Sequence, residues 1–116
     1  MDVSVVDTDG QAWRAHDRYS GVYVRRATNP GVSADVEVRV LRLDPGAEIA
    51  SHIHAGSAET IYIVKGDALL LLSGGEQRCS AGSCIHAPAA QIHALRNAGT
   101  GDLEIIAIFT PALPGR

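Results

Sequence analysis

Turn-forming residues recur along the whole chain at intervals too short for long helices. The 116 residues include 12 glycines and 5 prolines, which gather with Asn, Asp and Ser in short segments. Because glycine and proline interrupt regular structure, this spacing divides the chain into pieces of strand length. No apolar stripe of helical period and useful length is found, and residues 11–20 are the one candidate for a short helical or irregular piece.

The segments between the turns have the residue patterns of β-strands. Residues 36–40 alternate valine with charged side chains, which is typical of a half-buried strand. The alternating apolar positions then change from even-numbered to odd-numbered residues at Leu41 and Leu43. This change predicts a bulge or a corner within this strand. Residues 61–64 and 103–109 are apolar on both parities, so both faces of these strands should be covered.

Glycines and strand spacing together predict the fold class. Gly74-Gly75 separates residues 69–72 from residues 77–79, and it predicts a hairpin whose two central residues have positive φ. Short strands at regular spacing predict an all-β, antiparallel sandwich or barrel. The length suits a single domain, and the sequence shows no internal repeat, low-complexity tract or second domain.

Composition excludes several classes of partner. With 10 basic and 13 acidic residues the net charge is 10 − 13 = −3, which disfavours nucleic acid and anionic membranes. The longest apolar run, residues 68–72, is far shorter than the roughly 20 residues that span a bilayer. The first seven residues lack the basic start and apolar stretch of a signal peptide, so we expect a cytoplasmic protein. Cys79 and Cys84 should then be free thiols, with a disulfide across the turn between them as the alternative.

Histidines carry the candidate chemistry. His52 and His54 lie two apart on an extended segment, and because side chains alternate along a strand they should share one face. Glu59 begins the next apolar segment, and His93 follows much later. Three imidazoles and one carboxylate suit a borderline divalent cation, and four protein ligands would leave open positions for a reactive site. Each signal alone has a plain alternative, namely an incidental histidine pair or a solvated carboxylate.

The joint spacing of these residues resembles the cupin family. Residues 46–97 carry the resemblance directly, and the flanking segments 36–43 and 103–109 extend it to most of the chain. The segment Gly46-x5-His52-x-His54-x4-Glu59-x6-Gly66 fits the first cupin motif at every fixed position. The segment Gly82-x5-Pro88-x-Ala90-x2-His93-x3-Asn97 fits the second motif, except that Ala90 replaces the usual glycine.

The resemblance implies a single-domain jelly-roll β-barrel of antiparallel strands. Residues 1–35 would form N-terminal strands or an irregular arm, residues 36–110 the barrel core, and residues 111–116 a tail. The glycines of the motifs would occupy turns that need backbone freedom. Asn97 would be a turn residue. Ala90 would strain its turn if this position has positive φ, and the favoured alternative is that the local turn differs slightly from that of the family.

The resemblance also implies a metal centre. One divalent transition metal ion per chain, which could be Fe, Mn, Ni or Zn, would be held by His52, His54, Glu59 and His93. Strand alternation would then place Ala50, Ile61, Ile63 and Leu95 beside these ligands and turn Tyr62 away. Such a small, aliphatic wall fits a small ligand that chelates through two oxygen atoms.

The remaining polar residues have two interpretations each. His86 is a candidate for a hydrogen-bonding or proton-transfer group beside the metal, with a solvated outer face as the alternative. Cys84 shares the parity of His86 and is expected to be a buried, inert thiol. His16 is expected at the surface. Arg96 is a weak candidate for contacting an anion, with a solvated strand charge as the alternative.

Two functional hypotheses follow. The first is a metal-dependent enzyme, a dioxygenase or a Lewis-acid isomerase or lyase, acting on a small oxygen-chelating organic or sugar-derived acid. The second is a non-catalytic module that binds or senses a metal and a small ligand. Residues 103–109, together with outward-facing Ile49 and Ile53, favour a homodimer that buries an outer sheet face.

Overall fold

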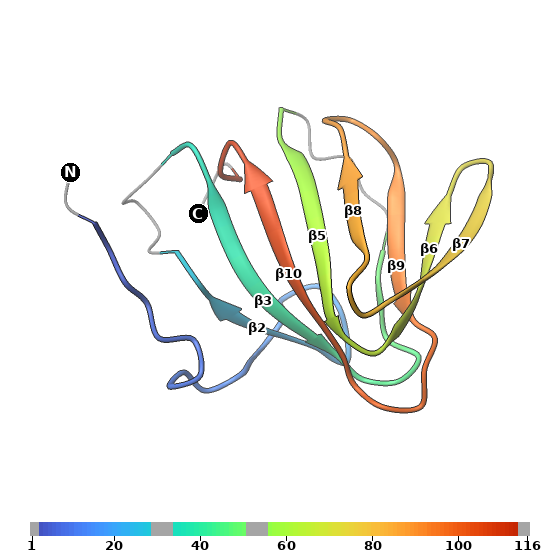
Figure 1. The fold of residues 1–116 in the computed structure, drawn as a ribbon, viewed down its shortest axis with the longest axis horizontal. Helices are drawn as coiled ribbons and strands as arrows, with labels where there is room; N and C mark the ends of the chain where they lie inside the picture. Colours follow the sequence, from blue (N-terminus) through green and yellow to red (C-terminus); the bar gives the residue numbers. More distant parts are fainter. Residues whose placement is uncertain (1–2, 29–33, 51–55, 114–116) are drawn as a thin grey trace.

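Two antiparallel β-sheets facing each other make up the molecule (Figure 1). The computed structural model describes residues 3–28, 34–50 and 56–113, and in this part all regular structure is strand. The larger sheet has the order β1-β2-β3-β10-β5-β8, and the smaller has the order β4-β9-β6-β7. The strands are β1 (Arg14–Ala15), β2 (Val22–Arg26), β3 (Glu37–Leu43), β4 (Glu48–Ile49), β5 (Ala58–Lys65), β6 (Asp67–Leu72), β7 (Gly75–Ser80), β8 (Cys84–Ala87), β9 (His93–Asn97) and β10 (Leu103–Thr110).

The predicted all-β, antiparallel jelly roll is confirmed. Within the described ranges the two sheets do not pair with each other, so the barrel is not closed by a continuous ladder. Residues 11–20 contain no helix and are irregular apart from β1. The described residues also include no helix that is long and apolar enough to cross a membrane.

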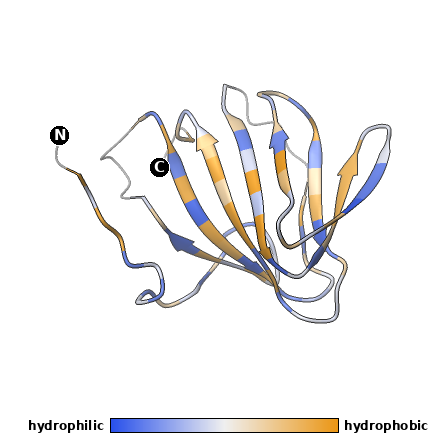
Figure 2. Cartoon of the chain, viewed as in Figure 1, coloured by the Kyte–Doolittle hydropathy of each residue, from blue (hydrophilic) through white to orange (hydrophobic). Residues whose placement is uncertain are grey.

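The core lies between the sheets, and strand alternation determines its members. Figure 2 shows polar and apolar residues alternating along β3, whereas β10 is apolar at most positions. Ile61 and Ile63 are buried as predicted, and Tyr62 between them is 44% exposed. Leu95 reaches the same core from the facing sheet. Complete burial of a side chain of this size contributes about 2 kcal/mol to folding.

Strand β3 departs from its predicted pattern. Its core-facing positions are Glu37, Arg39, Leu41 and Leu43, while its valines are only partly buried. The strand pairs with β2 and β10 without a shift in register, so the predicted bulge or corner within it is wrong. The apparent change of phase has another cause, because a buried ion pair occupies two positions where an apolar side chain is expected.

The predicted hairpin is present, but its turn lies one residue earlier than expected. Leu72 of β6 pairs with Gly75 of β7, so Ser73 and Gly74 are the two turn residues. Positive φ is found at Gly75 and not at Gly74, so the expectation of two central glycines with positive φ is wrong.

The three glycines of the motif positions have positive φ, as predicted, and Gly66 is also confined by its neighbours. Its φ is +101°, and a Cβ placed there would lie 2.8 Å from the carbonyl oxygen of Asp102. Asn97 fastens the neighbouring turn, because its side-chain amide donates to the carbonyls of Leu43 at 2.9 Å and Gly101 at 2.8 Å. Only glycine fits at residue 66 without moving the backbone before Leu103.

Two side chains fasten the N-terminal segment to the larger sheet. The Gln11 amide donates to the Arg26 carbonyl at 2.8 Å and accepts from the Arg26 N–H at 3.1 Å. The Trp13 ring lies 4.1 Å from the guanidinium of Arg25 and 5.2 Å from that of Arg42. Arg14 and the residues after it are therefore held against the edge of this sheet.

Candidate metal centre

Glu59 and His93 meet across the space between the two sheets. Glu59 is the second residue of β5 and faces inward from the larger sheet, and His93 begins β9 in the smaller one. The Glu59 Oε1 atom lies 2.6 Å from the His93 Nε2 atom. Only 7% of the Glu59 side chain and 11% of the His93 side chain are exposed. The chain therefore brings two of the four predicted ligands together in a largely water-free position.

The protonation pattern of the His93 ring follows from its second contact. The His93 Nδ1 atom lies 3.0 Å from the carbonyl oxygen of Gln91, and because a carbonyl only accepts, Nδ1 carries the hydrogen. Nε2 therefore faces a carboxylate oxygen and needs a cation between them. When Nε2 is protonated, it donates a hydrogen bond to Glu59, and this bond, opposed by burial, raises the pKa of His93.

This donor set fits a divalent metal ion. A carboxylate oxygen and an imidazole nitrogen are metal ligands, and a ligating imidazole usually donates its other N–H to a carbonyl or carboxylate. Gln91 supplies that carbonyl. His52 and His54, the other two predicted ligands, lie outside the described residues. Among the described residues no group of three or more His, Cys, Asp or Glu side chains could hold a metal ion.

The residues just before residue 51 do not follow the predicted alternation. Ile49 pairs with Leu95 and packs against the core, while Ala50 is exposed. Ile49 was expected to face outward and Ala50 inward, so both expectations are wrong. Ile53, also expected to face outward, lies outside the described residues. The strand β4 ends at Ile49, and the assumption of one continuous extended segment does not hold at Ala50.

The loop before His93 contains the one departure from the cupin motif. Ala90 has a φ of +67°, which is the left-handed conformation that the usual glycine would adopt easily. The expectation that the turn differs is therefore wrong, because alanine takes a glycine-like conformation. The Gln91 N–H donates to the carbonyl of Pro88 at 3.2 Å and closes this turn. The strained turn thus positions both Gln91 and His93.

A cavity of about 680 Å³ adjoins His93. Its volume lies in the range of sites for small molecules. Its wall is mixed, so the predicted small, aliphatic wall is wrong, and Ile61, Ile63 and Leu95 are packed in the core instead. The residues that line it include the apolar Leu70, Leu72, Ile85 and Ile92 and the polar Ser73, Glu76, Gln77, His86, Gln91 and His93.

His86 and Cys84 lie on the outer face of β8. The His86 Nδ1 atom lies 2.9 Å from the hydroxyl of Thr60, and both Cys84 and His86 are exposed. His86 is therefore solvated, and it also lines the cavity that adjoins His93, so both interpretations of this residue stay open. The expectation that Cys84 is buried is wrong, whereas both cysteines are free thiols as predicted.

Tyr19 is a neighbour of this centre that was not predicted. Tyr19 packs against the core, its ring lies 4.7 Å from that of His16, and its hydroxyl donates to the Ala50 carbonyl at 3.4 Å. The pKa of Tyr19 is raised overall, mainly by burial and in part by the Glu59 carboxylate, while the Arg18 guanidinium opposes this shift. His16 is partly buried rather than at the surface. An irregular segment has no periodicity from which these positions could be predicted.

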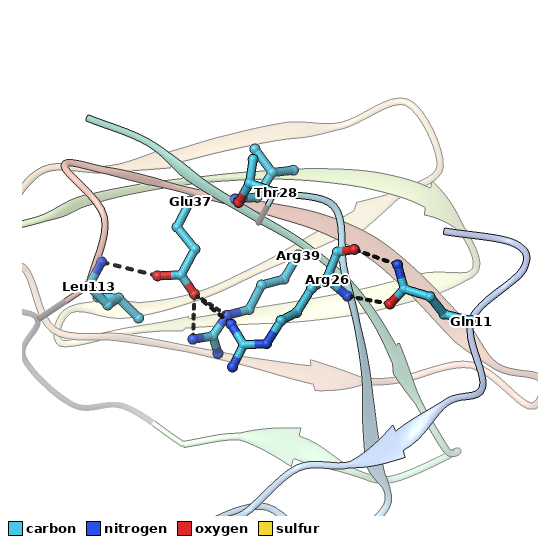
Figure 3. Close-up of polar contacts among 7 residues, drawn as sticks. Gln11, Arg26, Thr28, Glu37, Arg39 and Leu113 are labelled. Atoms are coloured by element: carbon cyan, nitrogen blue, oxygen red, sulfur yellow. Dashed lines mark hydrogen bonds and ion pairs between the residues drawn. The ribbon is translucent and has the colours of Figure 1, made fainter. Parts of the chain in front are cut away.

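Arginines were also missed by the sequence analysis. Figure 3 shows Arg26 and Arg39 of neighbouring strands converging on the carboxylate of Glu37. The Glu37 Oε2 atom accepts from the Arg39 Nε at 2.6 Å and lies 3.6 Å from the Arg26 Nη1. Arg96, the arginine singled out beforehand, instead lies 3.9 Å from Glu48 and is largely solvated.

The comparison with protein families gives one match. The family model described as a cupin domain matches residues 39–109, which is well over half of the chain. An oxalate-binding protein of Thermotoga maritima is 29% identical over 69 residues, which cover 60% of this chain and 57% of that protein. The chain thus spans little more than half the length of this curated relative.

Solved structures share the fold. KdgF from Halomonas sp. matches with a TM-score of 0.84 and 22% identity, over 96% of each chain. A predicted oxalate decarboxylase from Thermotoga maritima matches with a TM-score of 0.84 and 21% identity, over 94% of this chain and 100% of that one. The polyketide cyclase RemF from Streptomyces resistomycificus has the same TM-score of 0.84 at 14% identity, over 97% and 82% of the two chains. At these identities the likeness concerns the fold alone.

Proposed function

Because this chain is a member of the cupin family, we propose that it binds one divalent transition metal ion through His52, His54, Glu59 and His93. We propose further that it is an enzyme acting on a small oxygen-chelating organic or sugar-derived acid. One observation carries the proposal, namely the buried contact of 2.6 Å between Glu59 and His93, in which two cation-seeking atoms face each other. The adjoining cavity of about 680 Å³ supports it, since a small acid fits there beside His93.

The described residues have distinct tasks in this proposal. The Gln91 carbonyl keeps the hydrogen of His93 on Nδ1, so that Nε2 is directed at the site. Burial of Glu59 strengthens its attraction for a cation, because little water competes there. A bound divalent ion would supply Lewis-acid chemistry, and with iron it would also support oxygen chemistry. Isomerase, lyase and dioxygenase reactions are the candidates.

Elemental analysis of purified, never-chelated protein tests the metal proposal. We expect close to one equivalent of Fe, Mn, Ni or Zn per chain. His93→Ala should lose most of this metal, and His86→Ala, on the outer face of β8, should retain it. Equal metal content in His93→Ala and in the parent protein would show that the site is wrongly assigned.

The kind of reaction requires a separate assay. Oxygen uptake with a panel of small acids identifies a dioxygenase, and proton NMR of the same mixtures detects isomerisation or elimination. Protein from which metal has been removed is the control. Turnover that depends on metal supports an enzyme.

The alternative is a non-catalytic module that binds a metal and a small ligand. The oxalate-binding relative from Thermotoga maritima favours it. Metal-dependent binding of oxalate, measured by calorimetry, without turnover of any acid in the panel would support this alternative over an enzyme.

We also propose a homodimer that buries the outer face of the larger sheet. Ile106 of β10 pairs with Val40 on one side and with the exposed Tyr62 on the other. Ile108 and Val38 continue this apolar surface along the same strands. Light scattering should report a dimer, and Tyr62→Glu should dissociate it. A monomeric parent protein at micromolar concentration would contradict the proposal.

A further inference from the structure

A second cavity, of about 160 Å³, lies at the opposite edge of the larger sheet from β8. Strands β1, β2 and β3 and the segment after β1 form it. Four arginines line it, together with one histidine and one carboxylate, and they are Arg14, Arg18, Arg26, Arg39, His16 and Asp17. Asp17 is the single acidic residue on this wall, so the cavity carries an excess of positive charge.

The nearest buried carboxylate does not neutralise this charge. Glu37 alone serves both Arg26 and Arg39, and its other oxygen accepts from the backbone N–H of Leu113 at 3.2 Å. Arg14 and Arg18 have no ion pair within the described ranges. One carboxylate beside two guanidinium groups leaves a net positive charge. Arg14 and Arg18 add further positive charge to the cavity.

Arg39 has a hydrogen-bond donor that remains unused in the part of the chain that the structure describes. Its side chain is only 7% exposed, and its Nη2 atom lies 2.6 Å from the Glu37 Oε2 atom. Nη2 is buried and forms no hydrogen bond within the described residues, although it is ion-paired with Glu37. This nitrogen therefore still has donor capacity that an oxyanion in the cavity can use.

The arginine-lined cavity and the candidate metal centre share one sheet face. Phe109 of β10 pairs with Glu37 on β3 and with Glu59 on β5, so both carboxylates lie in one row of the sheet. Arg39 occupies the next inward position of β3. Two strand spacings and one inward step separate the backbones of Arg39 and Glu59 by about 12 Å.

We propose that this cavity, formed by Arg14, Arg18, Arg26 and Arg39, binds a terminal oxyanion, a carboxylate or a phosphate group, of the substrate. This inference rests on the proposed function and narrows it to acids that carry a second anionic group. A volume of about 160 Å³ accommodates such a group. Guanidinium groups match oxyanions because their planar N–H donors pair with two oxygens at once.

Calorimetry on the full chain tests this inference, with malonate and inorganic phosphate as probes at constant ionic strength. The protein is titrated as purified and again after chelation, because a metal ion would itself attract both anions. We expect the chelated chain to bind at least one probe. Arg14→Gln and Arg18→Gln, which alter exposed arginines and should fold normally, should each weaken binding roughly tenfold. A stronger response to malonate identifies a carboxylate, and a stronger response to phosphate identifies a phosphate group.

Arg78→Gln is the matched control, because Arg78 is an exposed arginine of β7 in the other sheet. Its affinity should equal that of the parent protein. The inference is overturned if the chelated chain binds neither anion, if the two variants bind as well as the parent, or if Arg78→Gln weakens binding to the same extent. Anion binding without any uptake of metal would instead refute the proposed function and leave the oxyanion site standing.

Discussion

The carbonyl of Gln91 accepts a hydrogen bond from Nδ1 of His93, two residues further along the chain, at 3.0 Å. The contact fixes which ring nitrogen is presented to Glu59. The two residues belong to the turn and the strand that follow Pro88, so the backbone itself orients the imidazole. An imidazole oriented by the backbone tolerates side-chain substitution at residue 91, because the carbonyl remains.

In the metal-free protein we expect His93 to titrate above the ordinary pKa of histidine, since Glu59 stabilises its charged form. Because the folded pKa is raised, the resulting stabilisation is complete below pH about 6.5, the unfolded value, and is lost as the pH rises through the folded value. NMR titration of the imidazole signals measures this. Glu59→Gln should lower the pKa of His93, and an unchanged value would contradict the role assigned to Glu59.

Ala90→Gly should stabilise the protein. A left-handed alanine costs about 1–2 kcal/mol, and the greater freedom of unfolded glycine cancels about half of the gain. We expect about 0.5–1 kcal/mol in urea denaturation, with unchanged metal content. Ala89→Gly, one residue earlier and also exposed, is the control and should not stabilise. A loss of stability in Ala90→Gly would show that the turn is not strained.

Gly66→Ala should be among the most damaging small substitutions in the chain. Both its positive φ and the carbonyl of Asp102, 2.8 Å from the new Cβ, oppose it. We expect a loss of about 3 kcal/mol in the free energy of unfolding. Gly82→Ala has a similar φ of +92° but open space around the Cβ, so it should cost only about 1 kcal/mol. Equal losses in the two variants would mean that the contact with Asp102 is unimportant.

The buried ion pair of β3 predicts strong coupling between its members. Arg39→Met leaves the buried Glu37 carboxylate with only the Arg26 guanidinium, which is 3.6 Å away and partly exposed, and should cost about 3 kcal/mol. Glu37→Leu should cost a similar amount. The double variant should lose less than the sum of the two losses, because it leaves no fully buried charge unpaired at this position and Arg26 is partly solvated. Additive losses in a denaturation cycle would show that the pair is not coupled.

The antiparallel all-β class, the hairpin and the inward faces of β5 and β9 could be predicted because each depends on local periodicity and turn residues. Ile61, Ile63 and Leu95 follow the simple alternation of a strand with one face in the core. Strand β3 does not, since a carboxylate and a guanidinium occupy core positions and only their mutual contact makes this possible. Such compensation is a property of the folded chain and leaves no periodic signal.

The residues of the candidate site likewise include some that could be predicted from the sequence and some that could not. Motif spacing predicted Glu59 and His93 as site residues, and the fold brings them together. Their role as metal ligands stays a prediction. His52 and His54, the domain boundaries and the cytoplasmic location also remain predictions. Tyr19 and Arg14 could not be predicted, because they lie in or beside an irregular segment that is positioned by contacts of Gln11 and Trp13 with β2 and β3.

The pairing of Phe109 with both Glu37 and Glu59 fixes the distance between these two residues across β10. Because the two carboxylates are partners of the same residue, their backbones are held about 10 Å apart by two hydrogen-bonded ladders, whatever the side chains do. A molecule that contacts the surroundings of both Glu37 and Glu59 must therefore have a length that matches this distance, whatever functional groups it carries. Affinities for a series of acids that differ by one methylene group at a time would show which ligand length matches this distance.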